Sequence, residues 1–276
     1  MKLNNKYWSK FLLIRLLEIG FLVLIIISFS TYGQHENTPS NFRVKTIIID
    51  AGHGGKDPGA VNGKTYEKDI VLAIALKLGK LIKNNLKDVR VIYTRDTDEF
   101  IELHERANIA NKNKANVFIS IHCNTGPLEK MIGTETYAMG IEKNSSNLEV
   151  SKRENSVVIL EENYLAKYDG FDPNSPEAHI IFSLYQNAYL DQSLNLASKV
   201  ENQMKIKAKR NSRGVKQAGF LVLWKTAMPS ILIETGFLSN PDEKKYLCSD
   251  TGQTNIANSI FKAFKEFKSE LEFSAR

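Results

Sequence analysis

Three apolar segments of this sequence each lead into a side chain that can bind a metal or transfer a proton. These side chains are His53, His122 and Glu234. Runs of β-branched apolar residues are typical of strands that are buried on both faces of a parallel or mixed sheet. Such sheets bind ligands just beyond the carboxyl ends of their strands. We therefore expect the three side chains to meet at one edge of one sheet, where they could perform metal-assisted hydrolysis.

Glu67 is the acid that could complete a metal site with the two histidines. A single histidine at a strand end is more often structural than a ligand, but two at matching ends with a nearby acid favour a metal. An acidic residue in the first turn of a helix also opposes the helix dipole, which is the structural alternative for Glu67. Because Glu67 ends the loop that begins at His53, its carboxylate can return to the same edge. Two imidazoles and one carboxylate form a catalytic zinc set with one position open for water.

Glu234 follows an apolar strand, which is a costly place for a free carboxylate. A salt bridge, or an interaction with a helix that begins after Gly236, would explain it structurally. The functional interpretation is a general base that takes a proton from zinc-activated water and later donates it to the leaving nitrogen.

The segments between these residues predict the elements that must position them. The predicted strands are 44–50, 89–94, 115–122, 133–139, 220–224 and 230–233. The predicted helices are 67–84, 102–113, 147–165, 176–207 (with Ser175 as N-cap), 241–247 and 255–270. Alternating strands and helices predict an α/β fold, a mixed and mostly parallel doubly wound sheet with helices on both faces.

The segment 1–33 predicts a secretory signal peptide, with basic residues, then an apolar run, then small residues. The alternative is a retained membrane anchor, but Arg15 and Glu18 leave an apolar stretch that is too short to span a bilayer comfortably. The protein is therefore expected to be exported to the periplasm or cell envelope. The rest of the chain is predicted as a linker (34–43), a catalytic domain (44–271) and a tail (272–276).

Net charge and cysteine content narrow the classes of function. The segment 1–33 holds four basic residues and one acidic residue, so without it the formal net charge falls from +6 to +3. That charge is too small to indicate nucleic-acid binding. Cys123 and Cys248 could pair in an exported protein, but buried free thiols are common, and we expect both to be free. The sequence carries no signal for an oligomeric state.

Several motifs together resemble one family. They are Asp50–Gly55, Glu67–Asp69, Thr94–Arg95, Arg106–Asn108, Ser120–Asn124 and Ile233–Asn240. In this order, within 46–247, they resemble the zinc-dependent N-acetylmuramoyl-L-alanine amidases of bacterial cell walls. The resemblance implies a peptidoglycan hydrolase that cuts the amide between the lactyl group of N-acetylmuramic acid and the L-alanine of the stem peptide. It also implies that His53, Glu67 and His122 are zinc ligands and that Glu234 is the catalytic glutamate.

A helical insertion at about 140–212 resembles the septum-splitting branch of this family, in which a helix covers the active site. The segment 152–156 matches that helix, and the match implies that Glu154 is a fourth zinc ligand in the resting state. The structural alternative is one charge on a polar, solvated helix. Autoinhibition of this kind implies an activator protein that displaces the helix. The branch implies a role in cell-wall remodelling and daughter-cell separation.

Two other functions are compatible with these residues. The first is another zinc hydrolase of the envelope, such as a carboxypeptidase or phosphoesterase, because a fold does not fix a substrate. The second is a non-catalytic module that binds the cell wall, although the complete set of four site residues argues against it.

Overall fold

The computed structural model describes residues 42–126, 129–141, 144–184 and 188–274. The predicted signal peptide and all but two residues of the predicted linker lie outside this part, as do the last two residues of the predicted tail. None of the described helices is long and apolar enough to cross a membrane.

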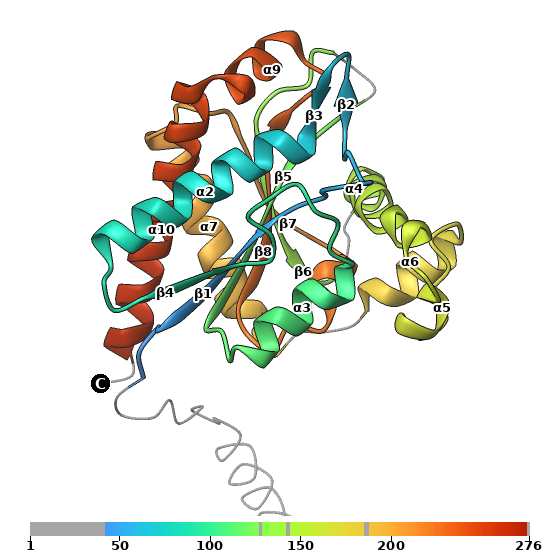
Figure 1. The fold of residues 1–276 in the computed structure, drawn as a ribbon, viewed down its shortest axis with the longest axis horizontal. Coiled ribbons are helices and arrows are strands. Elements are labelled where there is room, and N and C mark those ends of the chain that lie inside the picture. Colours follow the sequence, from blue (N-terminus) through green and yellow to red (C-terminus); the bar gives the residue numbers. More distant parts are fainter. Residues whose placement is uncertain (1–41, 127–128, 142–143, 185–187, 275–276) are drawn as a thin grey trace, which may run out of the picture. The chain divides into compact units, whose positions relative to one another are not determined.

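The centre of the fold is a six-stranded sheet with the strand order β4-β1-β5-β8-β6-β7 (Figure 1). In that order the strands are Arg90–Tyr93, Thr46–Ala51, Val117–Asn124, Ser230–Phe237, Thr134–Met139 and Ser212–Ala218. The first four are parallel, β6 is antiparallel to β8, and β7 is parallel to β6. The predicted mixed and mostly parallel sheet is confirmed. A separate two-stranded hairpin joins β2 (Val61–Asn62) to β3 (Thr65–Tyr66).

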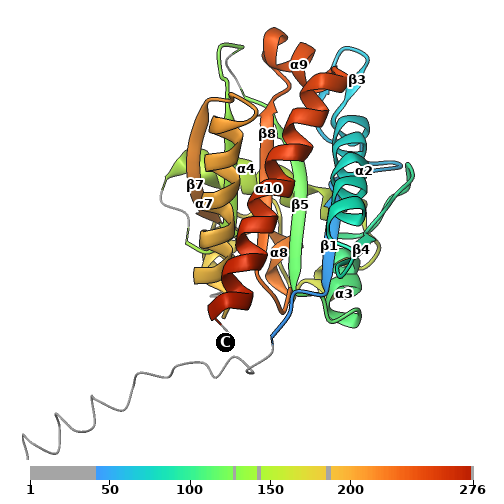
Figure 2. The ribbon, with the colours of Figure 1, turned by 90° about the vertical axis from the view of Figure 1, so that its left-hand side faces the viewer.

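Helices cover both faces of the sheet, as predicted. One face carries α2 (Glu67–Asn85), α7 (Leu190–Ile206) and α10 (Asp250–Ser274), which lie side by side in Figure 2. The other face carries α3 (Leu103–Lys112) and α8 (Leu221–Trp224), whereas α9 (Pro241–Cys248) follows β8. Successive side chains of a strand point to opposite faces, so Ile47 and Ile49 of β1 enter one apolar cluster and Ile48 the other.

Residues 144–184 form a group of short helices that we call the cover segment. It comprises α4 (Ser145–Asn155), the 3₁₀-helix η1 (Ser156–Leu160), α5 (Tyr164–Lys167) and α6 (Pro176–Ser183). The Asn144 side chain accepts a hydrogen bond from the Asn147 amide and so fixes the start of α4. The Asn155 side chain then binds the backbone of Gly219 and Leu221 at 2.7 and 2.9 Å. These contacts hold the end of α4 against the sheet edge.

The prediction of one long helix at 176–207 is wrong, because α6 and α7 are separate helices. Phe182 of α6 packs into the cluster on one face of the sheet, and Val200 of α7 packs into the cluster on the other. One straight helix cannot serve both faces. Ile181 and Leu184, whose spacing fits a buried helical seam, are instead 62% and 57% exposed.

The predicted strand at 220–224 is also wrong, because Leu221–Trp224 forms α8. A short run of apolar residues suits a buried strand and a buried helical turn equally well. The strand of this region is β7, which precedes α8 and which no sequence pattern indicated. As an edge strand, β7 is only partly buried and carries polar residues, so its apolar alternation is weak.

Candidate metal centre

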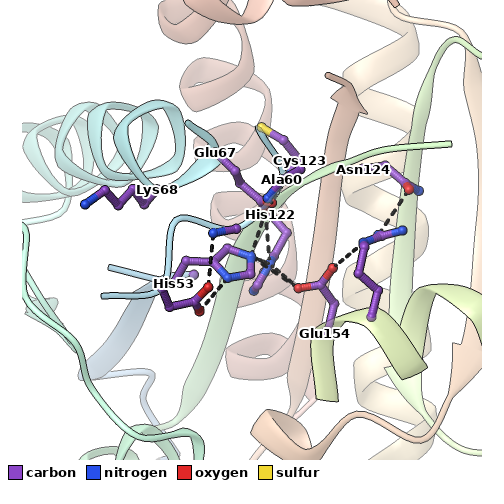
Figure 3. A network of polar contacts seen from close by, with 12 residues as sticks. His53, Ala60, Glu67, Lys68, His122, Cys123, Asn124 and Glu154 are labelled. Atoms are coloured by element: carbon purple, nitrogen blue, oxygen red, sulfur yellow. Dashed lines mark hydrogen bonds and ion pairs between the residues drawn. The ribbon is translucent and has the colours of Figure 1, made fainter. Parts of the chain in front are cut away.

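Four predicted side chains converge at the carboxyl edge of the parallel strands. His53 lies in the loop after β1, His122 lies near the end of β5, and Glu67 is the first residue of α2. Glu154 reaches them from α4, so the cover segment contributes directly to the site (Figure 3). All four side chains are buried.

Each of the four side chains directs one potential ligand atom toward a common centre. These atoms are His53 Nε2, His122 Nδ1, Glu67 Oε1 and Glu154 Oε2, and all lie within 4.8 Å of one another. Five of the six distances between them are 3.1–3.2 Å. The centre of a regular tetrahedron with such edges is about 1.9 Å from each corner, close to the roughly 2.0–2.2 Å of zinc–nitrogen and zinc–oxygen bonds. This geometry suits a tetrahedral cation.

The hydrogen bonding of the carboxylates supports the same conclusion. Glu67 is aimed by two backbone amides, with Oε1 accepting from Cys123 and Oε2 from Ala60, both at 2.8 Å. Glu154 Oε1 accepts from Arg153 at 2.9 Å. Glu154 Oε2, however, is buried without a hydrogen bond in the described part of the chain. A buried carboxylate oxygen with no donor is costly, and a metal ion would satisfy it.

The loop that carries His53 has a strained conformation that the surrounding residues hold in place. The backbone of His53 adopts a positive φ, which is unusual for a residue other than glycine. Arg106 donates to the His53 carbonyl at 2.8 Å and forms a buried ion pair with Asp50 at 2.9 Å. Arg95 donates to the Gly52 carbonyl at 2.7 Å. These two buried arginines therefore fix the position of a candidate metal ligand.

Asp57 orients the His53 ring. Its Oδ2 lies 2.7 Å from His53 Nδ1, so Nε2 is the nitrogen left to face the centre. A carboxylate behind a ligating imidazole fixes the ring tautomer and raises its basicity. Asp57, Arg106 and Arg153 were not predicted from the sequence as contributors to the site. An acid four residues after His53 in the same loop was the signal available for Asp57.

The electrostatics of the centre reflect close packing of charges. Burial alone would raise the pKa of Glu67, but the two histidines outweigh it and lower that pKa to about 2. Burial alone would lower the pKa of His122, but Glu154 and Glu67 outweigh it and raise that pKa to about 9. The two carboxylates thus stay charged and favour protons on the imidazoles, and a bound cation would have to displace those protons.

Glu234 lies beside this centre and differs from its ligands. It is fully buried on β8, directly across from His122 in the parallel pairing of β5 and β8. Burial, reinforced by the charge of Glu154, raises the pKa of Glu234 to about 8. It forms an ion pair with Arg153 of α4, with Nη2 at 3.5 Å from Oε1. Glu234 is therefore a carboxylate whose pKa lies near neutrality.

A second group of histidine and glutamate lies away from the centre, and we call it the capping cluster. It consists of Glu102, His104 and Glu161. Lys167 donates to both oxygens of Glu102 at 2.7 and 2.8 Å. Glu161 accepts from the Leu103 amide at 2.8 Å and from the Tyr168 hydroxyl. These contacts cap the start of α3.

The fold and the site together define an α/β protein with a buried group of histidine and glutamate side chains that could hold a metal ion, and with a buried carboxylate beside it. Comparison with known families gives the particular assignment. The family described as N-acetylmuramoyl-L-alanine amidase matches residues 47–266. The chain belongs to this family.

Individual relatives agree with the family assignment. The chain is 34% identical over 220 residues to N-acetylmuramoyl-L-alanine amidase AmiA of Escherichia coli K12, covering 78% of this chain and 73% of the relative. Among solved structures, the CwlD amidase of Clostridioides difficile in complex with the GerS lipoprotein is 31% identical with a TM-score of 0.60, covering 82% and 99% of the two chains. The catalytic domain of CwlV from Bacillus (Paenibacillus) polymyxa is 30% identical with a TM-score of 0.58, covering 81% and 97%.

Proposed function

We propose that this protein is a zinc-dependent amidase that hydrolyses peptidoglycan between the lactyl group of N-acetylmuramic acid and the L-alanine of the stem peptide. The observation that carries this proposal is the set of four ligand atoms, with neighbours at 3.1–3.2 Å, in a chain of the amidase family. Two imidazole nitrogens and carboxylate oxygens suit zinc. When bound, zinc would polarise the scissile carbonyl and lower the pKa of water.

Glu234 supplies the proton transfer in this proposal. A general base is most effective when its pKa lies near the working pH, and burial raises the pKa of Glu234 to about 8. Its carboxylate takes the proton of the attacking water and delivers it to the nitrogen that leaves with L-alanine. Its position across from His122 in the sheet supports this role.

Glu154 and α4 keep the enzyme in a resting state in this proposal. Glu154 Oε2 occupies the corner of the tetrahedron that water needs for attack. Activation then requires an activator protein that binds the uncovered state more tightly than the covered one. One solved relative, the CwlD amidase in complex with the GerS lipoprotein, is consistent with regulation by a protein partner.

The cellular setting follows from the substrate. We propose that residues 1–33 direct export, so that the enzyme acts in the periplasm or cell envelope during wall remodelling and daughter-cell separation. Mass spectrometry of the protein recovered from the envelope would identify its first residue and show whether the segment has been cleaved.

Digestion of purified sacculi tests the reaction. We expect mass spectrometry to detect intact stem peptides with a free L-alanine amine. Loss of terminal residues only would favour a carboxypeptidase, and release of phosphate only would favour a phosphoesterase. Binding to sacculi without any cleavage, in wild type and in the uncovered variant described next, would favour a wall-binding module.

Glu154→Ala tests the resting state. We expect this variant to raise basal cleavage of sacculi, because it frees the fourth corner while leaving three ligands. Glu162→Ala is the matched control, since Glu162 is an exposed acid of the same cover segment. Unchanged or lower basal cleavage by Glu154→Ala, with zinc still bound, would show that Glu154 does not restrain the enzyme.

A further inference from the structure

A pocket of about 670 Å³ opens beside the metal centre. Asn124 and Arg153 form its wall on that side and contact each other at 3.2 Å. Arg153 also approaches Glu234 at 3.5 Å, so the pocket begins next to the proposed general base. In Figure 3, Asn124 lies on the opposite side of Glu154 from His53. A substrate held at the centre can therefore continue into this pocket.

Two cations share the carboxylate of a glutamate that lines the pocket, and one of them, Arg213, lines the pocket as well. Glu135 of β6 is buried, and its Oε1 accepts from Arg213 Nε at 2.5 Å and pairs with Lys216 Nζ at 2.7 Å. Although burial raises the pKa of Glu135, its hydrogen bonds from Lys216 and Tyr137 outweigh that effect and lower it, so the carboxylate is ionised. The single negative charge of Glu135 is therefore shared by Arg213 and Lys216. Lys216 is the more buried of the two cations, at 16% exposed against 33% for Arg213.

Arg213 is held in a way that leaves donors for a ligand. Its Nε is used by Glu135, and its guanidinium lies over the Phe237 ring with 5.2 Å between Cζ and the ring centroid. Its two Nη groups make no hydrogen bond among the described residues of the chain. A planar guanidinium with two free amino groups matches a carboxylate in a bidentate arrangement.

The other acid that lines the pocket does not cancel this charge. Glu149 of α4 is 70% exposed and pairs with Lys152 on the same helix, with 3.3 Å between Nζ and Oε1. Its carboxylate is therefore neutralised locally and screened by water.

The sheet sets the distance between the centre and Arg213. Glu234 is on β8, Glu135 pairs with it from β6, and Arg213 is on β7, so two strand spacings separate the ends. Two spacings amount to about 10 Å. An extended peptide advances about 3.5 Å per residue, so its second or third residue reaches this wall.

We propose that the pocket binds the peptide side of the substrate and that Arg213 pairs with a carboxylate on the second or third residue of the peptide. This inference rests on the proposed amidase function and deepens it by assigning a preference for acidic stem peptides. Arg213 is a specificity residue in this account, and Lys216 balances the charge of Glu135.

Matched substrates test the preference. N-acetylmuramoyl tripeptides with free carboxylates at the second and third residues are compared with forms in which one or both are carboxamides. The zinc-loaded Glu154→Ala/Glu234→Gln enzyme is used, because its fourth corner is free and it should cleave slowly. We expect it to bind the preferred acidic form about tenfold more tightly by calorimetry, as charge-assisted hydrogen bonds predict. Adding Arg213→Gln should make binding of both forms equal, and adding Arg213→Lys should retain part of the preference. Adding Lys112→Gln, a change at an exposed lysine on α3, should leave the preference unchanged.

Three results would overturn the inference. They are equal binding of acidic and amide forms by the Glu154→Ala/Glu234→Gln enzyme, a preference that survives the addition of Arg213→Gln, and no binding of either form to the zinc-loaded Glu154→Ala/Glu234→Gln enzyme. Cleavage of sacculi measured in parallel separates this failure from failure of the proposed function. If sacculi are cleaved with release of stem peptides while the preference is absent, only the inference about Arg213 is wrong.

Discussion

The metal centre and the capping cluster use the same residue types but differ in how their carboxylates are satisfied. At the capping cluster, the carboxylates accept hydrogen bonds from Lys167, Tyr168 and a backbone amide. His104 Nδ1 lies 3.4 Å from an oxygen of Glu102 and 3.6 Å from an oxygen of Glu161. At the metal centre the corresponding distances are 3.1–3.2 Å, and Glu154 Oε2 has no hydrogen bond in the described part of the chain. His104 Nδ1 also lacks a hydrogen bond in the described part of the chain, so the distinguishing features of the metal centre are the unsatisfied carboxylate oxygen and the shorter distances.

The prediction with the largest expected effect compares two substitutions of a buried glutamate by glutamine, one beside the metal centre and one in the capping cluster. Glu234→Gln should lower the rate of sacculus cleavage about 10²- to 10⁴-fold, the usual contribution of a general acid–base residue. Zinc content should be unchanged, because Glu234 is not a ligand in this account. Glu161→Gln, measured by the same assay, should cleave at close to the wild-type rate. Comparable losses in the two variants would remove the functional distinction between the regions.

A second test concerns the residue behind His53. Asp57→Asn should weaken zinc binding about 10- to 100-fold, as loss of a carboxylate behind a ligating imidazole typically does. Competition with a chromophoric chelator measures the affinity. Asp250→Asn is the control, because Asp250 is an exposed acid paired with Lys77. If Asp57→Asn binds zinc as tightly as the control, the orientation of His53 does not depend on Asp57.

The smallest expected effect is on stability at the capping cluster. Glu161→Gln weakens a buried hydrogen bond to the first amide of α3. Loss of such a bond should lower the free energy of unfolding by about 1 kcal/mol. Urea denaturation of the zinc-loaded protein measures this change, and the zinc stoichiometry should not move. A loss of bound zinc in this variant would mean that the capping cluster is also a metal site.

Three of the candidate ligands could be predicted because each coincides with a strong local signal. His53 and His122 follow apolar strands, and Glu67 begins a helix with clear apolar spacing. Parallel strands bring their carboxyl ends to one edge, so the convergence of these residues follows from topology. The structure places all three together, with Glu154 beside them.

Other parts of the site depend on contacts that sequence spacing does not encode. Arg106 lies far along the chain from the His53 carbonyl that it binds, and no periodic pattern links the two. Arg153 stands on a polar helix that resembles any solvated helix until its contacts with Glu154 and Glu234 are known. The α8 segment was misassigned for a related reason, since a short apolar run fits a helix or a strand.

The most direct test of the central claim is the zinc content of the purified protein and of two histidine variants. We expect about one zinc per chain in the wild-type protein, loss of that zinc in His122→Ala, and retention of it in His104→Ala. A wild-type protein that takes up no zinc, or a His122→Ala variant that keeps a full equivalent, would contradict the metal centre.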